Sequence, residues 1–267
     1  GLEKNPFEKG NDGCVVEGID YREVMGRLNY LKEIKGIGLI TGRPGVGKTF
    51  AVKQFCDSLN QGLYRVVYVS MSTLSVVEFY RELSMGFGLE SYAKKIDNYR
   101  SLQDHIRKMA VEKRVTPVIV VDEAQYLNTE ILNDLKMLLN FDFDSKNHAI
   151  VILVGLTNLE SILKRAVHEA LRQRVVIQYQ IIGIDENEVK NYIETKLKDA
   201  GRVEPLFDEG ALHALANACQ GSSRKLNNII TLFDIFFLFF ILYCDCNQQY
   251  KEENNMLIPD LLNYLLF

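Results

Sequence analysis

One run of residues, Gly42-Arg43-Pro44-Gly45-Val46-Gly47-Lys48-Thr49, has the composition and spacing of a loop that binds the phosphates of a nucleotide. In this pattern the glycines let backbone N–H groups turn toward the phosphates at the positive end of a helix. Lys48 then reaches the β- and γ-phosphates, and the Thr49 hydroxyl ligates Mg²⁺. The apolar run Ile37–Thr41 predicts the required strand before the loop, and Phe50–Phe55 predicts the helix after it. We therefore expect nucleotide contacts from Gly42, Arg43, Pro44, Gly45, Val46, Gly47, Lys48, Thr49 and Phe50.

A second run, Pro117–Glu123, is a hydrophobic strand that ends in two acids. Ligands of open α/β sheets bind at the carboxyl ends of the strands, where these acids would lie. There Asp122 would hold Mg²⁺ through its water shell, and Glu123 would polarise the attacking water as general base. The four residues Asp122–Gln125 are also similar to the DEAD/DEAH boxes of helicases. Those enzymes need two tandem nucleotide-binding cores, and this chain has room for one.

The elements that position these residues alternate along the chain, which is typical of a parallel α/β sheet covered on both faces. Further strands are predicted at Arg65–Ser70, Pro117–Asp122, Ala149–Gly155 and Val175–Ile181. Helices are predicted at Lys48–Asn60, Val76–Gly86, Leu102–Lys113, Thr129–Leu139 and Leu159–Ala170, and then at Asp185–Ala200, Asp208–Cys219 and from Ser222 onward. The last three each begin with an Asp or Ser suited to capping.

The order of these elements predicts an α/β core with a five-stranded parallel sheet, followed by a small all-helical domain. We expect a nucleotide-binding domain at residues 1–183, a helical lid domain at 184–243 and a tail at 244–267. The apolar run Ile235–Cys244 is shorter than the roughly 20 residues that a membrane span needs, so a covered helix is favoured there. The sequence suggests no function for the tail.

Composition sets outer limits. The chain has 267 residues, of which 47% are hydrophobic and 25% charged, with a net charge of −4, so a soluble globular protein is expected. The negative net charge does not favour nucleic-acid binding, although it is compatible with a local basic surface. The cysteines are odd in number and scattered, which favours free thiols in a reducing compartment; they are Cys14, Cys56, Cys219, Cys244 and Cys246. Neither the C-x-C at Cys244 nor the spacing of the histidines favours a metal site. No signal peptide is visible, so we expect a cytoplasmic protein. The sequence starts at Gly1 without an initiating Met, so we expect that a short leader is missing.

Together the motifs resemble those of the AAA+ ATPases. The resemblance points to the clade of origin-recognition proteins, transposition-helper ATPases (TniB/TnsC/MuB-like) and the ATPase domain of ExeA-type secretion proteins, and it extends from about Pro6 to Thr231. It implies ATP and Mg²⁺ as cofactors and a P-loop AAA+ core followed by a lid.

The resemblance also implies three further site residues. Val154–Asn158 matches the sensor-1 segment, with Asn158 as the residue that orients the lytic water and Thr157 as the alternative. Arg174, with Arg172 as the competitor, stands where the family carries an arginine finger that acts on the neighbouring subunit's ATP. Gly221-Ser222-Ser223-Arg224 looks like the sensor-2 motif, in which Arg224 contacts the γ-phosphate from the lid.

Two other segments are candidates for contacts. Asn5-Pro6-Phe7 resembles the family's entry segment near the adenine, where Phe7 either lines the adenine pocket or acts as a hydrophobic staple. The segment Tyr92–Arg114 has more basic than acidic residues and is the best candidate for contacting DNA phosphates, a solvated helix face being the alternative. Its basic residues are Lys94, Lys95, Arg100, Arg107, Lys108, Lys113 and Arg114.

The expected function is that of a Mg²⁺-dependent ATPase of the transposition-helper type. The resemblance implies ATP-dependent head-to-tail oligomers, duplex DNA as a partner and recruitment or regulation of a transposase, with no membrane association. The alternatives are the ATPase domain of an ExeA-like secretion protein and a nucleotide-dependent switch with little turnover. Secretion-type relatives continue into a membrane segment and a further domain, whereas this sequence ends at Phe267, which favours the helper.

Overall fold

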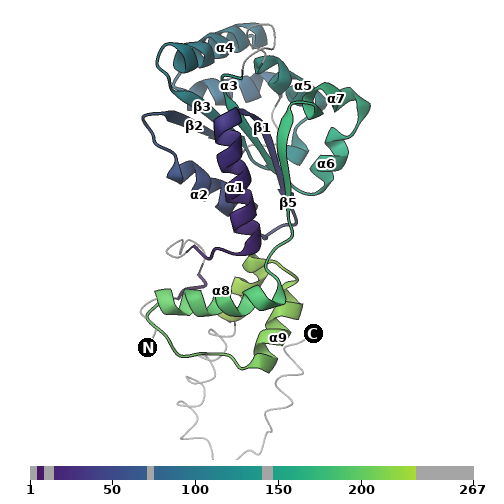
Figure 1. The fold of residues 1–267 in the computed structure, drawn as a ribbon. Helices are drawn as coiled ribbons and strands as arrows, with labels where there is room; N and C mark the ends of the chain where they lie inside the picture. The colour runs from purple at the N-terminus through teal and green to yellow at the C-terminus, as the bar shows by residue number, and fades with distance from the viewer. Residues whose placement is uncertain (1–4, 9–14, 71–74, 140–146, 233–267) are drawn as a thin grey trace, which may run out of the picture.

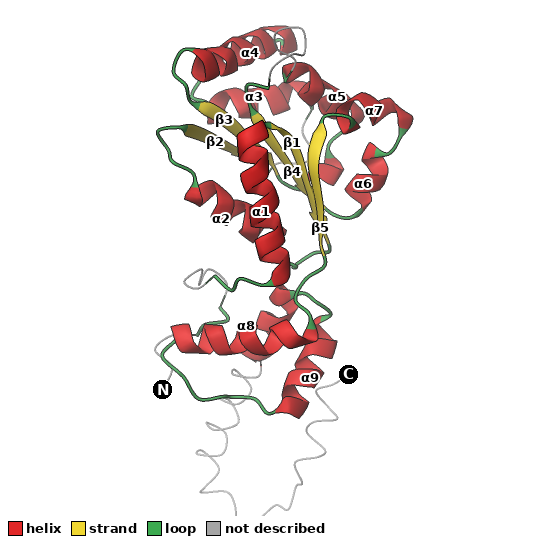
Figure 2. Ribbon diagram, viewed as in Figure 1, coloured by secondary structure: helices red, strands yellow, loops and turns green. Residues whose placement is uncertain are grey.

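The fold is an α/β layer structure joined to a smaller group of helices (Figures 1 and 2). The computed structural model describes residues 5–8, 15–70, 75–139 and 147–232. The expected tail at 244–267, the apolar run 235–244, Cys14, Cys244 and Cys246 lie outside the described residues. The two cysteines within them, Cys56 and Cys219, are free thiols.

A five-stranded sheet forms the centre of the α/β layer, in the order β2-β3-β4-β1-β5, and each pair of neighbouring strands is parallel. The strands are β1 (Gly36–Gly42), β2 (Tyr64–Val69), β3 (Thr116–Val121), β4 (Ile150–Gly155) and β5 (Val175–Ile181). The three inner strands are rich in Val, Ile, Leu and Gly and are almost wholly buried, because helices cover both faces. The five-stranded parallel α/β fold predicted from the sequence is confirmed, and each strand boundary lies within one residue of its predicted position.

Helices pack on the two faces of this sheet (Figure 2). On one face lie α1 (Ile19–Ile34) and α2 (Lys48–Ser58), whose apolar residues share a core with alternate residues of β3 and β4. On the other face lie α3 (Val76–Gly86), α4 (Lys95–Val111), α5 (Thr129–Leu138), α6 (Asn158–Leu163) and α7 (Glu169–Arg172). Two short 3-10 helices, η1 (Ala124–Tyr126) and η3 (Ala166–His168), complete this part.

After Gly183 the described chain is helical. This helical region (residues 184–232) contains α8 (Glu186–Asp199), α9 (Glu209–Cys219) and a helix over residues 223–232. The predicted caps are present, since the side chain of Asp185 accepts from the Glu188 N–H at 2.7 Å and that of Asp208 accepts from the Ala211 N–H at 2.7 Å. The region has its own core, which includes Phe7 from the N-terminal segment together with Val189, Ile193, Leu197, Leu215, Cys219, Leu226 and Ile230.

Three helix predictions need correction. α1 was not predicted, because its buried face rests on Val24, Leu28 and Leu31 within a mostly polar stretch. α4 begins at Lys95, earlier than expected, because the buried Asn98 side chain bonds backbone groups of Tyr92 and Lys94 and stabilises the first turn. The helix expected over residues 159–170 is broken, because Arg165 adopts an extended backbone (φ −64°, ψ 143°) between α6 and η3.

No helix among the residues described here combines the length and the apolar character required to cross a bilayer.

Candidate functional site

The loop between β1 and α2 begins where β1 ends and closes at Lys48, the first residue of α2. Gly45 and Gly47 adopt positive φ angles (79° and 98°), which the phosphate-loop turn requires and which other residues rarely adopt. Gly42 packs so closely on β5 that a Cβ there would lie 2.7 Å from the Ile181 carbonyl oxygen. The local sequence therefore forms the tight loop that the motif predicts.

Lys48 is 7% exposed and its ammonium group points into this loop. Nζ donates to the carbonyl oxygens of Gly42 (3.0 Å) and Arg43 (2.9 Å). Burial lowers the pKa of Lys48, and the nearby carboxylates of Glu123 and Asp122 act in the opposite direction. The structure thus places a buried cation near two acids at the end of the sheet.

Asp122 follows β3 directly and is 5% exposed. Its Oδ2 accepts hydrogen bonds from the Thr49 hydroxyl and from the Tyr68 hydroxyl, both at 2.7 Å, and its Oδ1 accepts from the Glu123 N–H at 2.8 Å. Burial, the hydrogen bond to Asp122 and the two nearby acids raise the pKa of the Tyr68 hydroxyl, so Tyr68 remains a donor. Thr49 and Asp122 therefore present adjacent oxygen atoms, as the sequence predicts, while Tyr68 was not foreseen.

Glu123 occupies a left-handed backbone conformation (φ 52°, ψ 35°), which costs a non-glycine residue about 1–2 kcal/mol. The turn places its carboxylate beside Gln125, whose Nε2 donates to Glu123 Oε2 at 2.6 Å. The same amide accepts from the Leu156 N–H at 2.9 Å through Oε1. Gln125 links the segments that follow β3 and β4, and its place directly after Asp122-Glu123-Ala124 was the available sequence signal.

The segment after β4 contains the sensor-1 candidates. β4 pairs with β1 and β3, so this segment leaves the sheet at the same edge as the phosphate loop and Asp122. Asn158 is the first residue of α6, and both it and Thr157 are exposed. One turn further, the Glu160 carboxylate accepts from the fully buried Thr41 hydroxyl at 2.5 Å, which joins α6 to the end of β1. This link was not predicted, because nothing in the local pattern relates two residues so far apart in the chain.

The helical region contacts the tip of the phosphate loop. The Gly45 carbonyl oxygen accepts from the Ser223 hydroxyl at 3.1 Å and from the Arg224 N–H at 3.2 Å. A Cβ on Gly45 would lie 2.4 Å from Ser222 Oγ, so glycine is required for this approach as well as for its φ. The exposed Arg224 side chain is close enough to Lys48 for its charge to lower the pKa of that lysine further.

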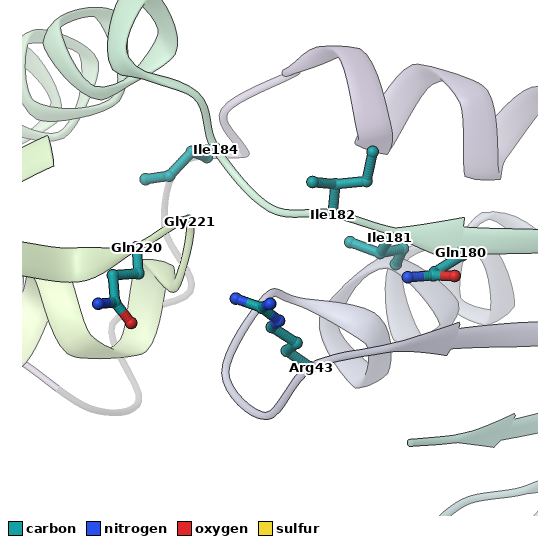
Figure 3. A pocket seen from close by; sticks show the side chains of 7 residues that line it. All are labelled: Arg43, Gln180, Ile181, Ile182, Ile184, Gln220 and Gly221. Carbon is teal, nitrogen blue, oxygen red and sulfur yellow. The ribbon is translucent and has the colours of Figure 1, made fainter. Parts of the chain in front are cut away.

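A cavity of about 320 Å³ lies where the phosphate loop, the linker after β5 and the helical region meet (Figure 3). Arg43 extends into it from the loop, toward Gln220 and Gly221 on one side and the linker isoleucines on the other. Its lining residues are Arg43, Gln180, Ile181, Ile182, Ile184, Gln220 and Gly221. Phe7, the other candidate for such a pocket, is buried in the core of the helical region.

The arginine-finger candidates lie elsewhere. Both precede β5 and so lie at the amino edge of the sheet, whereas the phosphate loop lies at the carboxyl edge. Arg174 is half-buried and its Nη1 donates to the Lys136 carbonyl oxygen at 2.9 Å. Arg172 ends α7 and is exposed. The site of one chain therefore contains Lys48, Thr49, Asp122, Glu123 and Arg224, and contains neither finger candidate.

The basic segment at Tyr92–Arg114 lies mostly on α4, at the end of the sheet away from the helical region (Figure 1). Part of its charge is paired: Lys95 with Asp134 at 2.6 Å, and Arg107 and Lys108 with Asp104 at 3.5 and 2.7 Å. The exposed pairs of Asp104 contribute little stability. All three pairs reduce the positive field of the surface.

Comparison with known proteins gives a consistent picture. Residues 32–163 match a protein-family model described as an AAA domain. The chain is 28% identical over 236 residues to the General secretion pathway protein A of Aeromonas hydrophila, covering 86% of this chain and 42% of that protein. It is 24% identical over 124 residues to the ATP-dependent target DNA activator B of Escherichia phage Mu, covering 46% of this chain and 37% of that protein. The chain thus spans less than half the length of these curated relatives.

Solved structures share the fold. The Cdc6p protein of Pyrobaculum aerophilum superposes with a TM-score of 0.64 at 15% identity, over 85% of this chain and 63% of that one. The ORC2 protein of Aeropyrum pernix, in ADPNP–ADP complexes, gives a TM-score of 0.62 at 15% identity, over 96% and 70%. The fold is that of the AAA+ P-loop ATPases, and the family model that matches residues 32–163 describes an AAA domain.

Proposed function

We propose that this chain binds ATP with Mg²⁺ and hydrolyses it in a site formed by the phosphate loop, the acids after β3 and the helical region acting as a lid. The observation that carries the proposal is the convergence of Lys48, Thr49, Asp122 and Glu123 at one sheet edge, with the Ser223–Arg224 helix start hydrogen-bonded to the loop. In this proposal the core domain ends at residue 183 and the lid domain begins at 184.

Nucleotide binding would use the loop Gly42–Thr49 and Phe50. The loop's backbone N–H groups and Lys48 would surround the phosphates, where the helix dipole of α2 adds to the positive field. The cavity bounded by Arg43 and the linker after β5 is open to the same loop and offers isoleucine side chains for the apolar face of a base. A nucleotide in this place would touch core and lid together.

The residues present fit a magnesium ion. Mg²⁺ prefers oxygen ligands and is usually held by one or two carboxylates together with substrate phosphates and water. The Thr49 hydroxyl and the Asp122 carboxylate lie 2.7 Å apart at the loop, so both can face one ion. The ion supplies charge neutralisation at the phosphate oxygens when bound.

In hydrolysis Glu123 would polarise the attacking water, and Asn158 would orient that water from the segment after β4. Lys48 and Arg224 would neutralise the charge that develops on the γ-phosphoryl group, Arg224 from the lid. Arg174, or the competing Arg172, would add a positive charge to the site of a neighbouring subunit.

The test is Glu123→Gln, which keeps the shape of the side chain and removes the base. We expect ATP to bind as in the wild type and kcat to fall by about 10²–10⁴-fold, the usual size of a general-base contribution. The matched control is Glu130→Gln, which changes an exposed acid on α5. Near-normal turnover in Glu123→Gln would reject Glu123 as the group that activates water.

For the biological role we propose the transposition-helper type, which assembles head to tail with ATP on duplex DNA and recruits or regulates a transposase. The resemblance to the phage Mu target DNA activator supports this role over 46% of the chain. The proposed DNA surface is the basic segment on α4.

A second candidate role, the ATPase module of an ExeA-like secretion protein, is favoured by the more extensive match to General secretion pathway protein A, over 86% of the chain. The response of the protein to duplex DNA distinguishes the two roles. Duplex DNA should raise the ATPase rate and bind with a strong salt dependence if the chain is a transposition helper. If the chain is a secretion module, duplex DNA should neither raise the ATPase rate nor bind to the protein. A third outcome, tight ATP binding with negligible turnover under all conditions, would indicate a nucleotide switch.

A further inference from the structure

Gln125 is a buried amide that the ATPase scheme above does not use. It lies in η1, two residues after Glu123, and is 7% exposed. Its NH₂ group donates to Glu123 Oε2 at 2.6 Å, and its carbonyl oxygen accepts from the Leu156 N–H at 2.9 Å. One side chain thereby joins the acid after β3 to the segment after β4.

Both neighbouring segments are shaped around this amide. A Cβ on Gly155 would lie 2.6 Å from Gln125 Oε1 and 2.9 Å from Leu159 Cδ2, so the chain leaves β4 without room for a side chain. On the other side, Glu123 takes its left-handed conformation while its N–H is held by Asp122 Oδ1. Glu123 is therefore held at both ends, its backbone N–H by Asp122 and its carboxylate by the Gln125 amide.

We propose that Gln125 is a positioning residue that couples the Glu123 carboxylate to the sensor-1 segment, Leu156–Asn158. This inference rests on the proposed ATPase function and assigns to that site a link that sets where its base lies. A displacement of the segment on contact with the γ-phosphate would be transmitted through the Leu156 N–H and the amide to Oε2. The other carboxylate oxygen, Oε1, is left to face the attacking water.

The chemistry of an amide suits this task. A carboxamide has a donor and an acceptor on one rigid plane, so it can bond a carboxylate and a backbone N–H at once. It is neutral, so it orients the carboxylate without donating a proton to it. Correct placement matters because a shift of about 1 Å in a catalytic group can reduce the rate by roughly 10²-fold.

The experiment disrupts the link in two ways. Gln125→Met keeps the volume and removes both hydrogen bonds, whereas Gln125→Glu keeps an acceptor for Leu156 and places a negative charge against Glu123. For both variants we expect kcat to fall by about tenfold or more, with KM and the Kd for ATP within about threefold of the wild type. Tyr126→Ala, an exposed neighbour in the same turn, is the control and should leave kcat unchanged.

A double-mutant cycle distinguishes coupling from simple support of the fold. If Gln125 acts by positioning the Glu123 carboxylate, Gln125→Met combined with Glu123→Gln should lose about as much kcat as Glu123→Gln alone. The proposal would be overturned if the kcat losses of the two single variants multiply in the double variant, or if kcat is normal in Gln125→Met. If Gln125→Met does not fold, as judged by circular dichroism, Gly155→Ala takes its place, because the new methyl group would displace the amide oxygen.

The outcome also separates this inference from the ATPase proposal. Loss of turnover in Glu123→Gln with normal turnover in Gln125→Met rejects the link and leaves the general base in place. Normal turnover in Glu123→Gln rejects both.

Discussion

At the scale of single residues, Lys48 combines burial with a positive charge, and its ammonium group is held by two carbonyl oxygens of the loop. Lys48→Ala removes the cation that would bind the β- and γ-phosphates. We expect the affinity for ATP to fall by about 100-fold or more, on the order of 3 kcal/mol, with the fold intact. Titration with a fluorescent ATP analogue measures the affinity, and circular dichroism checks the fold.

Lys53→Ala is the matched control, since Lys53 is an exposed lysine on the same helix. An ATP affinity equal to that of the wild type in Lys48→Ala would exclude the loop as the nucleotide site.

We expect His168 to make the stability of the protein depend on pH. Its side chain is 1% exposed, and burial, with the nearby Arg165, lowers its pKa below the ordinary value near 6.5. In the unfolded chain the group binds a proton at the ordinary pKa, so unfolding takes up protons as the pH falls below about 6.5. The contribution of neutral His168 to stability is therefore complete above that pH and is lost progressively below it.

His168→Leu should reduce this dependence. We expect the free energy of unfolding to fall less between pH 7.5 and pH 5.5 in the variant than in the wild type, as measured by urea denaturation at both values. His105, whose pKa is also lowered by burial, should account for part of the remaining slope. Equal slopes for His168→Leu and the wild type would show that His168 titrates alike in the folded and unfolded chain.

The sequence identified the residues whose chemistry is fixed by a contiguous motif. Lys48, Thr49, Asp122 and Glu123 lie together at the sheet edge, because the loop before Lys48 and the two acids each follow a strand whose apolar pattern is unambiguous. It did not identify contacts between distant segments. The bonds of Tyr68 to Asp122 and of Thr41 to Glu160 arise only when parallel strands bring their carboxyl ends together, and no local spacing encodes them.

At the scale of elements, the start of α1 is tied to the linker between the sheet and the helical region. Asp20 Oδ2 accepts from the N–H groups of Ile182 (2.8 Å) and Gly183 (2.7 Å), and its Oδ1 accepts from the Tyr179 hydroxyl at 2.6 Å. The first residue of α1 is also bonded to the helical region, because the Glu188 carboxylate of α8 accepts from the Ile19 N–H at 2.6 Å. These bonds fix the chain where a lid would pivot.

Asp20→Ala should therefore loosen the linker. We expect a loss of about 1–3 kcal/mol in the free energy of unfolding, because hydrogen bonds to a charged group are removed. Amide hydrogen exchange should become faster at residues 182–184, and ATP should bind more weakly because the lid is held less firmly against the loop.

Asp57→Ala, an exposed acid on α2, is the control for this change. Unchanged exchange at residues 182–184 in Asp20→Ala would show that the linker is held by other contacts.

The predictability of elements follows the strength of their patterns. Buried parallel strands are short apolar runs bounded by turns, and their ends were predicted to within one residue. Helices whose apolar face is sparse were predicted poorly. α1 depends on three buried residues among charged ones, and the helix expected over residues 159–170 is interrupted at Arg165, which precedes the buried His168. In both cases the decisive interactions come from other parts of the fold.

At the scale of the whole molecule, the nucleotide site and the finger candidates occupy opposite edges of the sheet. β5 has 7 residues, which at about 3.3 Å per residue separates its two ends by roughly 20 Å. A guanidinium at the amino edge is therefore too far from the phosphate loop of its own chain, and a contribution to catalysis requires a second chain. Of the two candidates, Arg174 is bonded to the Lys136 carbonyl, and Arg172 is exposed on α7.

A shared site makes turnover depend on assembly. We expect ATPase activity per chain to rise with protein concentration, and Arg174→Ala alone to reduce kcat by about 10³-fold or more if Arg174 is the finger. Mixing Arg174→Ala with Lys48→Ala chains should restore part of the activity, because an intact loop then meets an intact finger at some interfaces. Arg172→Ala, mixed in the same way, identifies which arginine acts: the one whose variant is inactive alone and rescued on mixing. Turnover that is independent of concentration, with no rescue for either arginine, would place the complete site within one chain and leave Arg174 as a structural bond to α5.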